Sequence, residues 1–161
     1  MGSDNLIELA AGLFKRAFEA QSHGDLDAAV DLYKRSLQAY PTAEAHTFLG
    51  WTYSFQGDLA AAIEECQKAI AVDPDFGNPY NDIGAYLLEL GRPDEAIPWL
   101  EKATRAARYE PRHFPHVNLG RAYAAKEMLS RALEEFQKAL ALAPENDTTQ
   151  AAIATLKRKL N

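Results

Sequence analysis

Cysteine is almost absent from this sequence of 161 residues, and long apolar runs are missing altogether. The single cysteine, Cys66, can form no internal disulfide and cannot build a cysteine-based zinc site, so a reducing compartment is allowed. No apolar run approaches the roughly 20 residues that would cross a bilayer, and no basic stretch precedes an apolar one at the N-terminus, as it would in a secretory signal. We therefore expect a cytoplasmic protein without membrane insertion.

Sequence signatures of catalysis are also missing. There is no Walker loop, no dinucleotide-binding fingerprint, no His-Glu-x-x-His and no Gly-x-Ser-x-Gly. His113 and His116 are spaced to share one helix face as metal ligands, but nothing nearby in the sequence supplies a convincing third and fourth ligand. We predict a protein that is not an enzyme and that uses no cofactor and no metal.

Positive charge is in deficit, because 23 acidic side chains outnumber 17 basic ones and give a net charge of −6 at pH 7. Such a chain is a poor candidate for binding nucleic acid through phosphate contacts. The densest basic stretch is interleaved with aromatic residues, as some RNA-binding surfaces are, but solvated arginines at a helix end explain it more simply. It consists of Arg105, Arg108, Arg112, His113, His116 and Arg121. We therefore predict no nucleic-acid partner.

The charge is distributed unevenly along the chain. Residues 1–100 hold 16 acidic and 6 basic side chains, a net charge of −10, whereas residues 101–161 hold 7 and 11, a net charge of +4. The chain is electrostatically bipolar, so two copies can attract each other head to tail.

An internal repeat dominates what the sequence does contain. A skeleton of apolar and small residues recurs after 34 residues between the second and third copies, returns later in the chain, and is fainter near its start. The four copies span about 10–42, 43–76, 77–112 and 113–146. The second copy carries the skeleton as Leu49-Gly50, Tyr53, Gly57, Ala62, Cys66, Ala69 and Pro74, where Cys66 is predicted to be a buried core thiol.

Each copy is predicted to be a pair of helices. Apolar and small residues fall at i, i+3, i+4 and i+7 in both halves, which is the period of a helix rather than of a strand. A turn separates the halves, in which Gly57 suits the left-handed residue that ends one helix and Asp58 can cap the next. Small residues, such as Gly84 facing Ala96, let the two helices approach closely. One hairpin cannot bury its apolar face alone, so the copies must stack.

This pattern resembles the tetratricopeptide repeat, in which Leu-Gly, Tyr, a small Ala, an aromatic residue, another Ala and a closing Pro recur. The resemblance covers about 137 of the 161 residues. It implies an all-α fold, an α-solenoid in which antiparallel helix pairs form a right-handed superhelix and the first helix of each pair lines a concave groove. We expect residues 1–161 to form a single domain, closed by a capping helix at about 147–161 whose apolar face carries Ile153, Leu156 and Leu160.

Three departures from the pattern carry structural expectations. The third copy is longer than the second, so we expect its second helix to run from Pro93 to about Tyr109. The turn glycine of the fourth copy is replaced by Glu127, so this turn is expected to adopt another conformation. Arg16 stands where the first copy should carry a large apolar residue, which weakens the prediction of its first helix.

The resemblance also implies which side chains point into the groove. Trp51 and Phe55 are four residues apart and form the strongest pair for an exposed apolar patch. Phe14 and Phe48 are equally well explained as packing against neighbouring helices. The predicted peptide-binding residues are Phe18, Trp51, Phe55, Asn78, Asn81, Asp82, Asn118 and Arg121.

The asparagines of this set leave two interpretations open. The carboxamides of Asn81 and Asn118 can donate to and accept from the backbone of an extended peptide, or they can tie adjacent helices together. The basic clamp by which some family members bind a C-terminal carboxylate is missing. Its positions hold Phe14, Phe18, Phe48, Asn78 and Asp82.

Two functions are compatible with these features. The first is a non-enzymatic adaptor or scaffold that binds a peptide or helix of a partner protein in the groove. The alternative is a self-assembling structural module that forms homo-oligomers through the groove or the solenoid ends.

Overall fold

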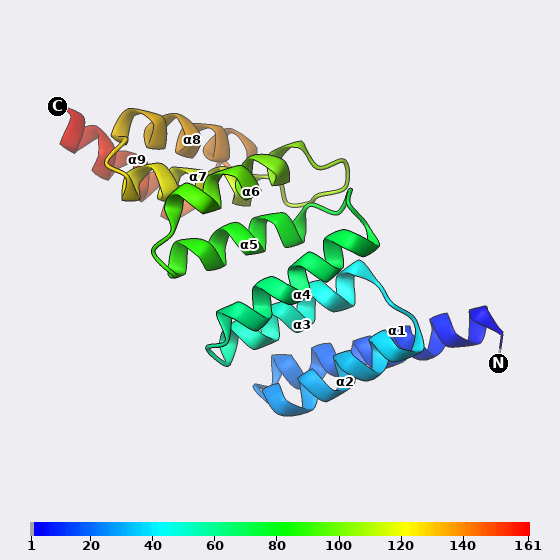
Figure 1. Cartoon of the computed structure of the whole chain (residues 1–161). Helices are drawn as coiled ribbons and strands as arrows, with labels where there is room; N and C mark the ends of the chain where they lie inside the picture. Colours follow the sequence, from blue (N-terminus) through cyan, green and yellow to red (C-terminus); the bar gives the residue numbers. More distant parts are fainter. Residues whose placement is uncertain (1) are drawn as a thin grey trace. The chain divides into compact units, whose positions relative to one another are not determined.

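The computed structural model describes residues 2–161, which fold into nine helices without a strand (Figure 1). The predicted all-α fold class is confirmed, and no helix in this part of the chain is long and apolar enough to span a membrane. In chain order the helices are α1 (Ser3–Ser22), α2 (Leu26–Ala39), α3 (Ala43–Phe55), α4 (Leu59–Val72), α5 (Asn78–Glu89), α6 (Pro93–Arg105), α7 (His113–Ala125), α8 (Leu129–Leu142) and α9 (Asp147–Leu160).

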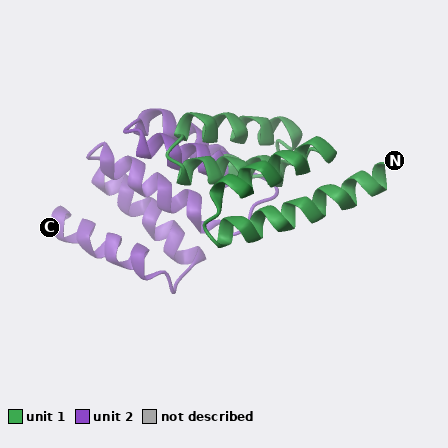
Figure 2. Ribbon diagram, turned by 90° about the horizontal axis from the view of Figure 1, so that it is seen from below, with its two compact units in different colours: residues 1–79 green, residues 80–161 purple. Residues whose placement is uncertain are grey.

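The chain divides into two compact units, residues 1–79 and residues 80–161 (Figure 2). In the first unit α1 packs against α2 and α3 against α4, and α2 also contacts α3. In the second unit α7 packs against α8, while α6 contacts α7 and α9 contacts α8. Each unit therefore buries the apolar faces of its hairpins between consecutive helices, as stacked hairpins must.

The turns inside the hairpins share one geometry. Gly24, Gly57 and Gly91 have positive φ angles of 80°, 83° and 74°, as their position at a helix end predicts. The carboxylate of Asp58 then accepts a hydrogen bond from the backbone N–H of Ala61 at 3.0 Å and caps α4. These turn and cap predictions are confirmed.

The turn of the last hairpin contradicts the expectation of a different conformation. Glu127 has a φ angle of 59°, so it occupies the left-handed region although it is not a glycine. The backbone N–H of Met128 donates to the carbonyl of Tyr123, as the N–H of Asp58 donates to the carbonyl of Tyr53 in the second hairpin. Packing of α7 against α8 imposes the common turn. Glu127 therefore adopts a left-handed backbone conformation that is unfavourable for a residue with a side chain.

Close approach within the hairpins occurs at glycines. A Cβ atom at Gly50 would lie 2.9 Å from the carbonyl oxygen of Ala62, and a Cβ atom at Gly84 would collide with the side chain of Leu100. A Cβ atom at Gly120 would lie 2.8 Å from the Phe136 ring. In the third and fourth hairpins the glycine therefore accommodates the large residue at the centre of the second helix.

The second helix of the third hairpin is shorter than predicted. It ends at Arg105 rather than near Tyr109, and the following residues leave the helix. The Tyr109 ring packs against Ala103 and Ala106, and the guanidinium of Arg112 donates to the carbonyls of Ala106 and Ala107 at 3.1 and 3.3 Å. Burial of this ring and capping of these carbonyls replace the extra helical turn.

The two ends of the chain also differ in detail from the expectations. Despite an exposed Arg16, α1 is regular and begins at Ser3. At the other end, the Asn146 side chain accepts from the Thr149 N–H at 2.9 Å and starts α9. Ile153 and Leu156 are buried in this helix, but Leu160, expected on the same face, is 44% exposed because it lies in the last turn.

Candidate functional site

Five aromatic side chains form a continuous row in the first unit, hereafter the aromatic row. Phe14 and Phe18 come from α1, and Phe48, Trp51 and Phe55 come from α3. Phe48 lies in the middle, with ring centroids 5.3 Å from Phe14, 5.8 Å from Phe18 and 5.8 Å from Trp51. These three contacts are edge-to-face, a favourable geometry for aromatic pairs. The Trp51 and Phe55 centroids are 5.0 Å apart, which extends the row to the end of α3.

Helix spacing produces the row. Phe48, Trp51 and Phe55 are three, four and seven residues apart, so they share one face of α3, and Phe14 and Phe18 share one face of α1. Beneath the row, the ring of Tyr33 from α2 is fully buried and contacts Phe14 at 5.5 Å. Its hydroxyl donates to Gln21 Oε1 at 2.7 Å, and burial raises the pKa of this phenol. The row therefore rests on a fixed, hydrogen-bonded core.

The exposure of the row separates its members into two groups. Phe18, Trp51 and Phe55 are 44%, 40% and 58% exposed, although each is a large apolar side chain. Phe14 and Phe48 are only half-exposed and pack under the others, as the alternative interpretation of these two residues holds. The accessible surface of the row thus belongs to Phe18, Trp51 and Phe55.

In the second unit, polar predicted site residues form a hydrogen-bonded chain. The guanidinium of Arg121 donates to Asn118 Oδ1 at 2.8 Å, and Asn118 Nδ2 donates to Asn81 Oδ1 at 2.9 Å. Asn81 and Asn118 are buried, and they join α5 to α7 in the way that the second interpretation of the asparagines describes. Asn78, at the start of α5, is half-buried, and Arg121 is exposed.

Asp82 follows Asn81 on α5 and is half-buried. The neighbouring Asn81 side chain lowers the pKa of the Asp82 carboxyl, because it favours the ionised form. Burial has the larger effect and raises the pKa of Asp82 to about 7. Burial raises the pKa of Tyr109, and the negative charge of Asp82 raises it further.

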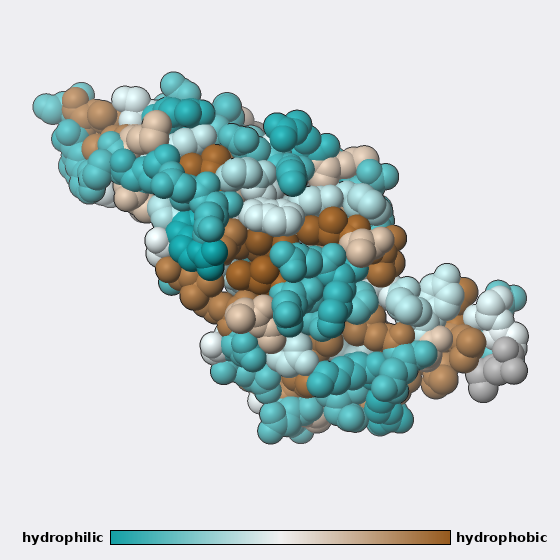
Figure 3. Space-filling view, viewed as in Figure 1, coloured by the Kyte–Doolittle hydropathy of each residue, from teal (hydrophilic) through white to brown (hydrophobic). Residues whose placement is uncertain are grey.

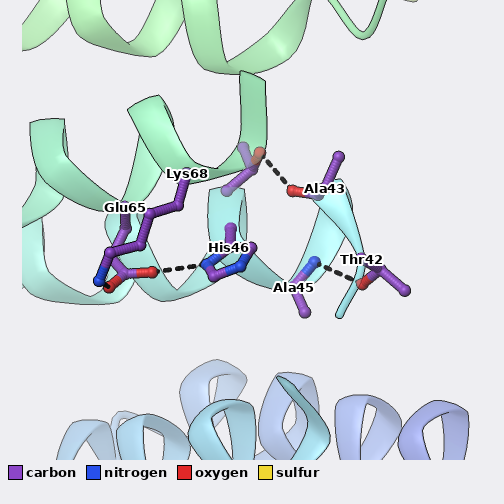
Figure 4. Close-up of polar contacts among 7 residues, drawn as sticks. Thr42, Ala43, Ala45, His46, Glu65 and Lys68 are labelled. Carbon is purple, nitrogen blue, oxygen red and sulfur yellow. Dashed lines mark hydrogen bonds and ion pairs between the residues drawn. The ribbon is translucent and has the colours of Figure 1, made fainter. Parts of the chain in front are cut away.

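A charged triplet, absent from the predicted site, occurs once in each unit. His46 on α3 donates to Glu65 on α4 at 2.7 Å, and Lys68 donates to the other oxygen of Glu65 at 2.9 Å (Figure 4). In the second unit, His116, Glu135 and Lys138 repeat the arrangement at 2.8 and 3.0 Å. The recurring spacing of 19 residues from His to Glu and 22 from His to Lys was the sequence signal that could have revealed it.

The third hairpin replaces this triplet with aromatic contacts. Tyr80 and Trp99 have the same spacing of 19 residues, and their ring centroids lie 6.2 Å apart. The Nζ atom of Lys102 lies 4.8 Å from the centroid of the Trp99 ring, within reach of a cation–π interaction. The same inter-helix position is thus filled by either an ion pair or an aromatic pair, which marks the triplet as structural.

An apolar pocket lies near the N-terminal end of the first unit. Its volume is about 310 Å³, and Ile7, Ala10 and Phe14 of α1 face Tyr40 and Thr42 across it. Ile7 and Leu9 are 43% and 46% exposed, and Figure 3 shows apolar side chains gathered at this end of α1. This is a second exposed apolar feature beside the aromatic row.

Comparisons with known proteins agree on one type of repeat. Two family models described as "Tetratricopeptide repeat" match residues 43–76 and residues 75–145. The type IV pilus assembly protein PilF of Pseudomonas aeruginosa is 29% identical over 139 residues, which are 86% of this chain and 53% of PilF. The photosystem I assembly protein Ycf3 of Prochlorococcus marinus is 29% identical over 113 residues, which are 61% of this chain and 65% of Ycf3.

Solved structures give the same result. The structure of Pseudomonas aeruginosa PilF matches with a TM-score of 0.88 and 25% identity over 99% of this chain and 71% of that chain. The chain spans about half the length of the curated PilF sequence and just under two thirds of Ycf3. Both curated relatives are named as assembly proteins.

Proposed function

The chain belongs to the tetratricopeptide repeat family, and from this premise we propose that it is a non-enzymatic adaptor that binds a peptide or helical segment of a partner protein. The observation that carries the proposal is the aromatic row, whose members Phe18, Trp51 and Phe55 expose large apolar surfaces. Names of the relatives, which describe assembly proteins, support a role in protein interaction.

Ring contacts hold the side chains of the aromatic row in place. Trp51 is held between Phe48 and Phe55, so little side-chain entropy remains to be lost when a partner packs against it. Buried tryptophan and other aromatic anchors supply much of the binding energy at protein interfaces. We propose that the row binds an apolar side chain of the partner segment.

Polar residues of α5 and α7 form a candidate surface of their own. One hydrogen bond joins the side chains of Asn81 and Asn118. Each carboxamide has two N–H donors and an oxygen acceptor with two lone pairs, so it can form further hydrogen bonds. Asn78 and Asp82 are half-buried, and Arg121 is exposed. We propose that these residues can contact the backbone and polar side chains of a partner segment independently of the aromatic row.

A substitution of Trp51 tests the proposal. Natural partners are captured by pull-down and identified by mass spectrometry, and affinity is then measured for the wild type, Trp51→Ala and Tyr40→Ala. Tyr40 is the matched control, because it is 41% exposed but lies outside the row. Trp51→Ala should weaken binding by about 2 kcal/mol, or roughly 30-fold, without loss of helicity. Equal affinities for the three proteins would remove Trp51 from the site.

A second candidate function, self-assembly, is favoured by the apolar pocket. Ile7 and Leu9 are exposed beside a pocket of about 310 Å³ at the N-terminal end of the first unit. A second copy could cover this surface, and the uneven charge along the sequence would favour a head-to-tail contact.

A further inference from the structure

We propose that the aromatic row binds an amphipathic helix of the partner protein, with apolar side chains on the face that contacts the row and basic side chains beside that face. This inference rests on the proposed adaptor function and adds the conformation and the charge of the segment that the row accepts. It concerns the first unit alone, residues 1–79.

The first argument is that the hydroxyl groups beside the row are already engaged. Serine and threonine side chains of α1 and α3 within one helical turn of the row each donate a hydrogen bond to a carbonyl of their own helix. They are Ser22 to Phe18 at 2.8 Å, Thr47 to Ala43 at 2.7 Å, Thr52 to Phe48 at 2.8 Å and Ser54 to Trp51 at 2.6 Å. Within the row itself, the indole N–H of Trp51 is the polar donor, since phenylalanine has none.

A surface with so few donors favours a helix over an extended segment. An extended segment packed on the row would press its backbone N–H and C=O groups against aromatic rings, where most would lose water without gaining a hydrogen bond. A helix satisfies these groups within itself and presents side chains. The nearby amides do not change this balance, because Gln56 donates to Asp27 and Gln21 is only 8% exposed.

The dimensions of the row agree with a helical partner. Phe48 and Phe55 are the first and last rings that α3 contributes, and two full turns of helix, about 10 Å, separate them. Apolar side chains at positions i, i+3, i+4 and i+7 of a partner helix cover the same length. One apolar stripe of a helix can therefore contact the row from end to end.

The second argument is the charge of the first unit. Residues 1–79 hold 12 acidic and 5 basic side chains, a net charge of −7 with histidine neutral. The two helices that form the row are acidic as well, since α1 and α3 together carry four acidic and two basic side chains. This field attracts a helix with lysine or arginine beside its apolar stripe and repels one with aspartate or glutamate there.

The experiment uses the full chain and three synthetic peptides of about 16 residues, roughly four turns of helix. The basic helical peptide has leucine at i, i+3, i+4 and i+7 and lysine elsewhere. The alternating peptide contains the same numbers of leucine and lysine in strict alternation, so its apolar face forms in an extended chain. The acidic helical peptide has glutamate in place of lysine. Each peptide carries a fluorescent label, and its affinity is measured by fluorescence anisotropy at physiological ionic strength.

We expect the basic helical peptide to bind about tenfold more tightly than either of the others, because it combines internal hydrogen bonds with complementary charge. This comparison uses the wild type, so it does not depend on the folding of any variant. Trp51→Ala should weaken binding of this peptide roughly 30-fold. Tyr40→Ala, which changes an exposed ring outside the row, should leave it unchanged. Circular dichroism checks that both variants keep their helicity.

Equal or tighter binding of the alternating peptide would overturn the preference for a helix, and equal binding of the acidic peptide would overturn the preference for basic charge. Either result would leave the adaptor function in place. An affinity for the basic peptide that does not change in Trp51→Ala would locate its contact outside the row and overturn the inference. Binding of none of the peptides would also overturn it, whereas the adaptor function is decided separately by the captured natural partners and their own Trp51→Ala comparison.

Discussion

Single residues carry the pH dependence that we expect of this protein. Burial alone would raise the pKa of Glu65, but the hydrogen bonds from His46 and Lys68 outweigh it and hold the pKa below its ordinary value of 4.5. Burial would likewise raise the pKa of Glu135, but the hydrogen bonds from His116 and Lys138 lower it below its ordinary value. A carboxyl with a lower pKa in the folded than in the unfolded state adds stability above the unfolded pKa and loses it as the pH falls through the folded one.

We therefore predict that the free energy of unfolding falls as the pH drops below about 4.5. Protonation of Glu65 and Glu135 should account for part of this loss. The double variant Glu65→Gln/Glu135→Gln should be less stable at pH 7 and should lose less stability between pH 5 and pH 3. Urea denaturation across this range measures it, with exposed Glu64→Gln as the neighbouring control. Parallel pH profiles of the double variant and the wild type would contradict the prediction.

Glu127 offers a second test at this scale. Its left-handed backbone costs a non-glycine residue about 1–2 kcal/mol, whereas glycine adopts it freely but loses about 0.5–1 kcal/mol of backbone entropy. Glu127→Gly should therefore stabilise the protein by up to about 1 kcal/mol in urea denaturation. The adjacent Lys126 has an ordinary φ of −93°, so Lys126→Gly should not stabilise. A loss of stability in Glu127→Gly would mean that its side chain makes a stabilising contact.

At the scale of helix pairs, the distance between two helices is set at one residue of each hairpin. Gly84 of α5 lies against Leu100 of α6, where an added Cβ atom would collide with the leucine side chain. Gly84→Ala should destabilise the protein by about 1–3 kcal/mol, because Leu100 has to leave its packed rotamer. Thermal or urea denaturation gives the value.

The matched control is another helical glycine with free space. A Cβ atom at Gly12 of α1 would meet nothing within 4 Å, so Gly12→Ala should stabilise the protein by about 0.5–1 kcal/mol. A loss of stability in Gly84→Ala together with a gain in Gly12→Ala would separate the effect of packing from that of helix propensity. Equal effects would show that contact with Leu100 does not govern position 84.

At the scale of the whole molecule, charge distribution decides between the two candidate functions. Net charges of −10 over residues 1–100 and +4 over residues 101–161 favour head-to-tail association of copies. Exposed charges are screened beyond roughly 8 Å at physiological salt, so such association should weaken as salt rises. Our prediction is a monomer, because the basic residues Lys157, Arg158 and Lys159 in the last turn of α9 are exposed to solvent.

Light scattering after size exclusion, at low and high salt and over a range of concentrations, measures the oligomeric state. A monomer under all conditions supports the adaptor and excludes self-assembly. An oligomer that dissociates at high salt would favour self-assembly, and Ile7→Glu would then show whether the apolar pocket takes part. An oligomer that resists salt but dissociates in Ile7→Glu would indicate apolar rather than electrostatic contact.

Sequence periodicity by itself determined the helices, their pairing and the turns of the first three hairpins. The period of 3.6 residues, the turn glycines and the caps such as Asp58 act between residues close in the chain, so the hairpins could be predicted without tertiary information. The same periodicity placed Trp51 and Phe55 on one exposed face of α3. The repeat pattern was sufficient for the family as well.

Only the tertiary structure decided which side chains meet. The end of α6 at Arg105, the left-handed Glu127, the contact of Gly84 with Leu100 and the bond between Asn118 and Asn81 all depend on packing between separate helices. Periodicity specifies the face on which a residue lies but not the partner across the interface, because that choice depends on side-chain volume and on competing hydrogen bonds.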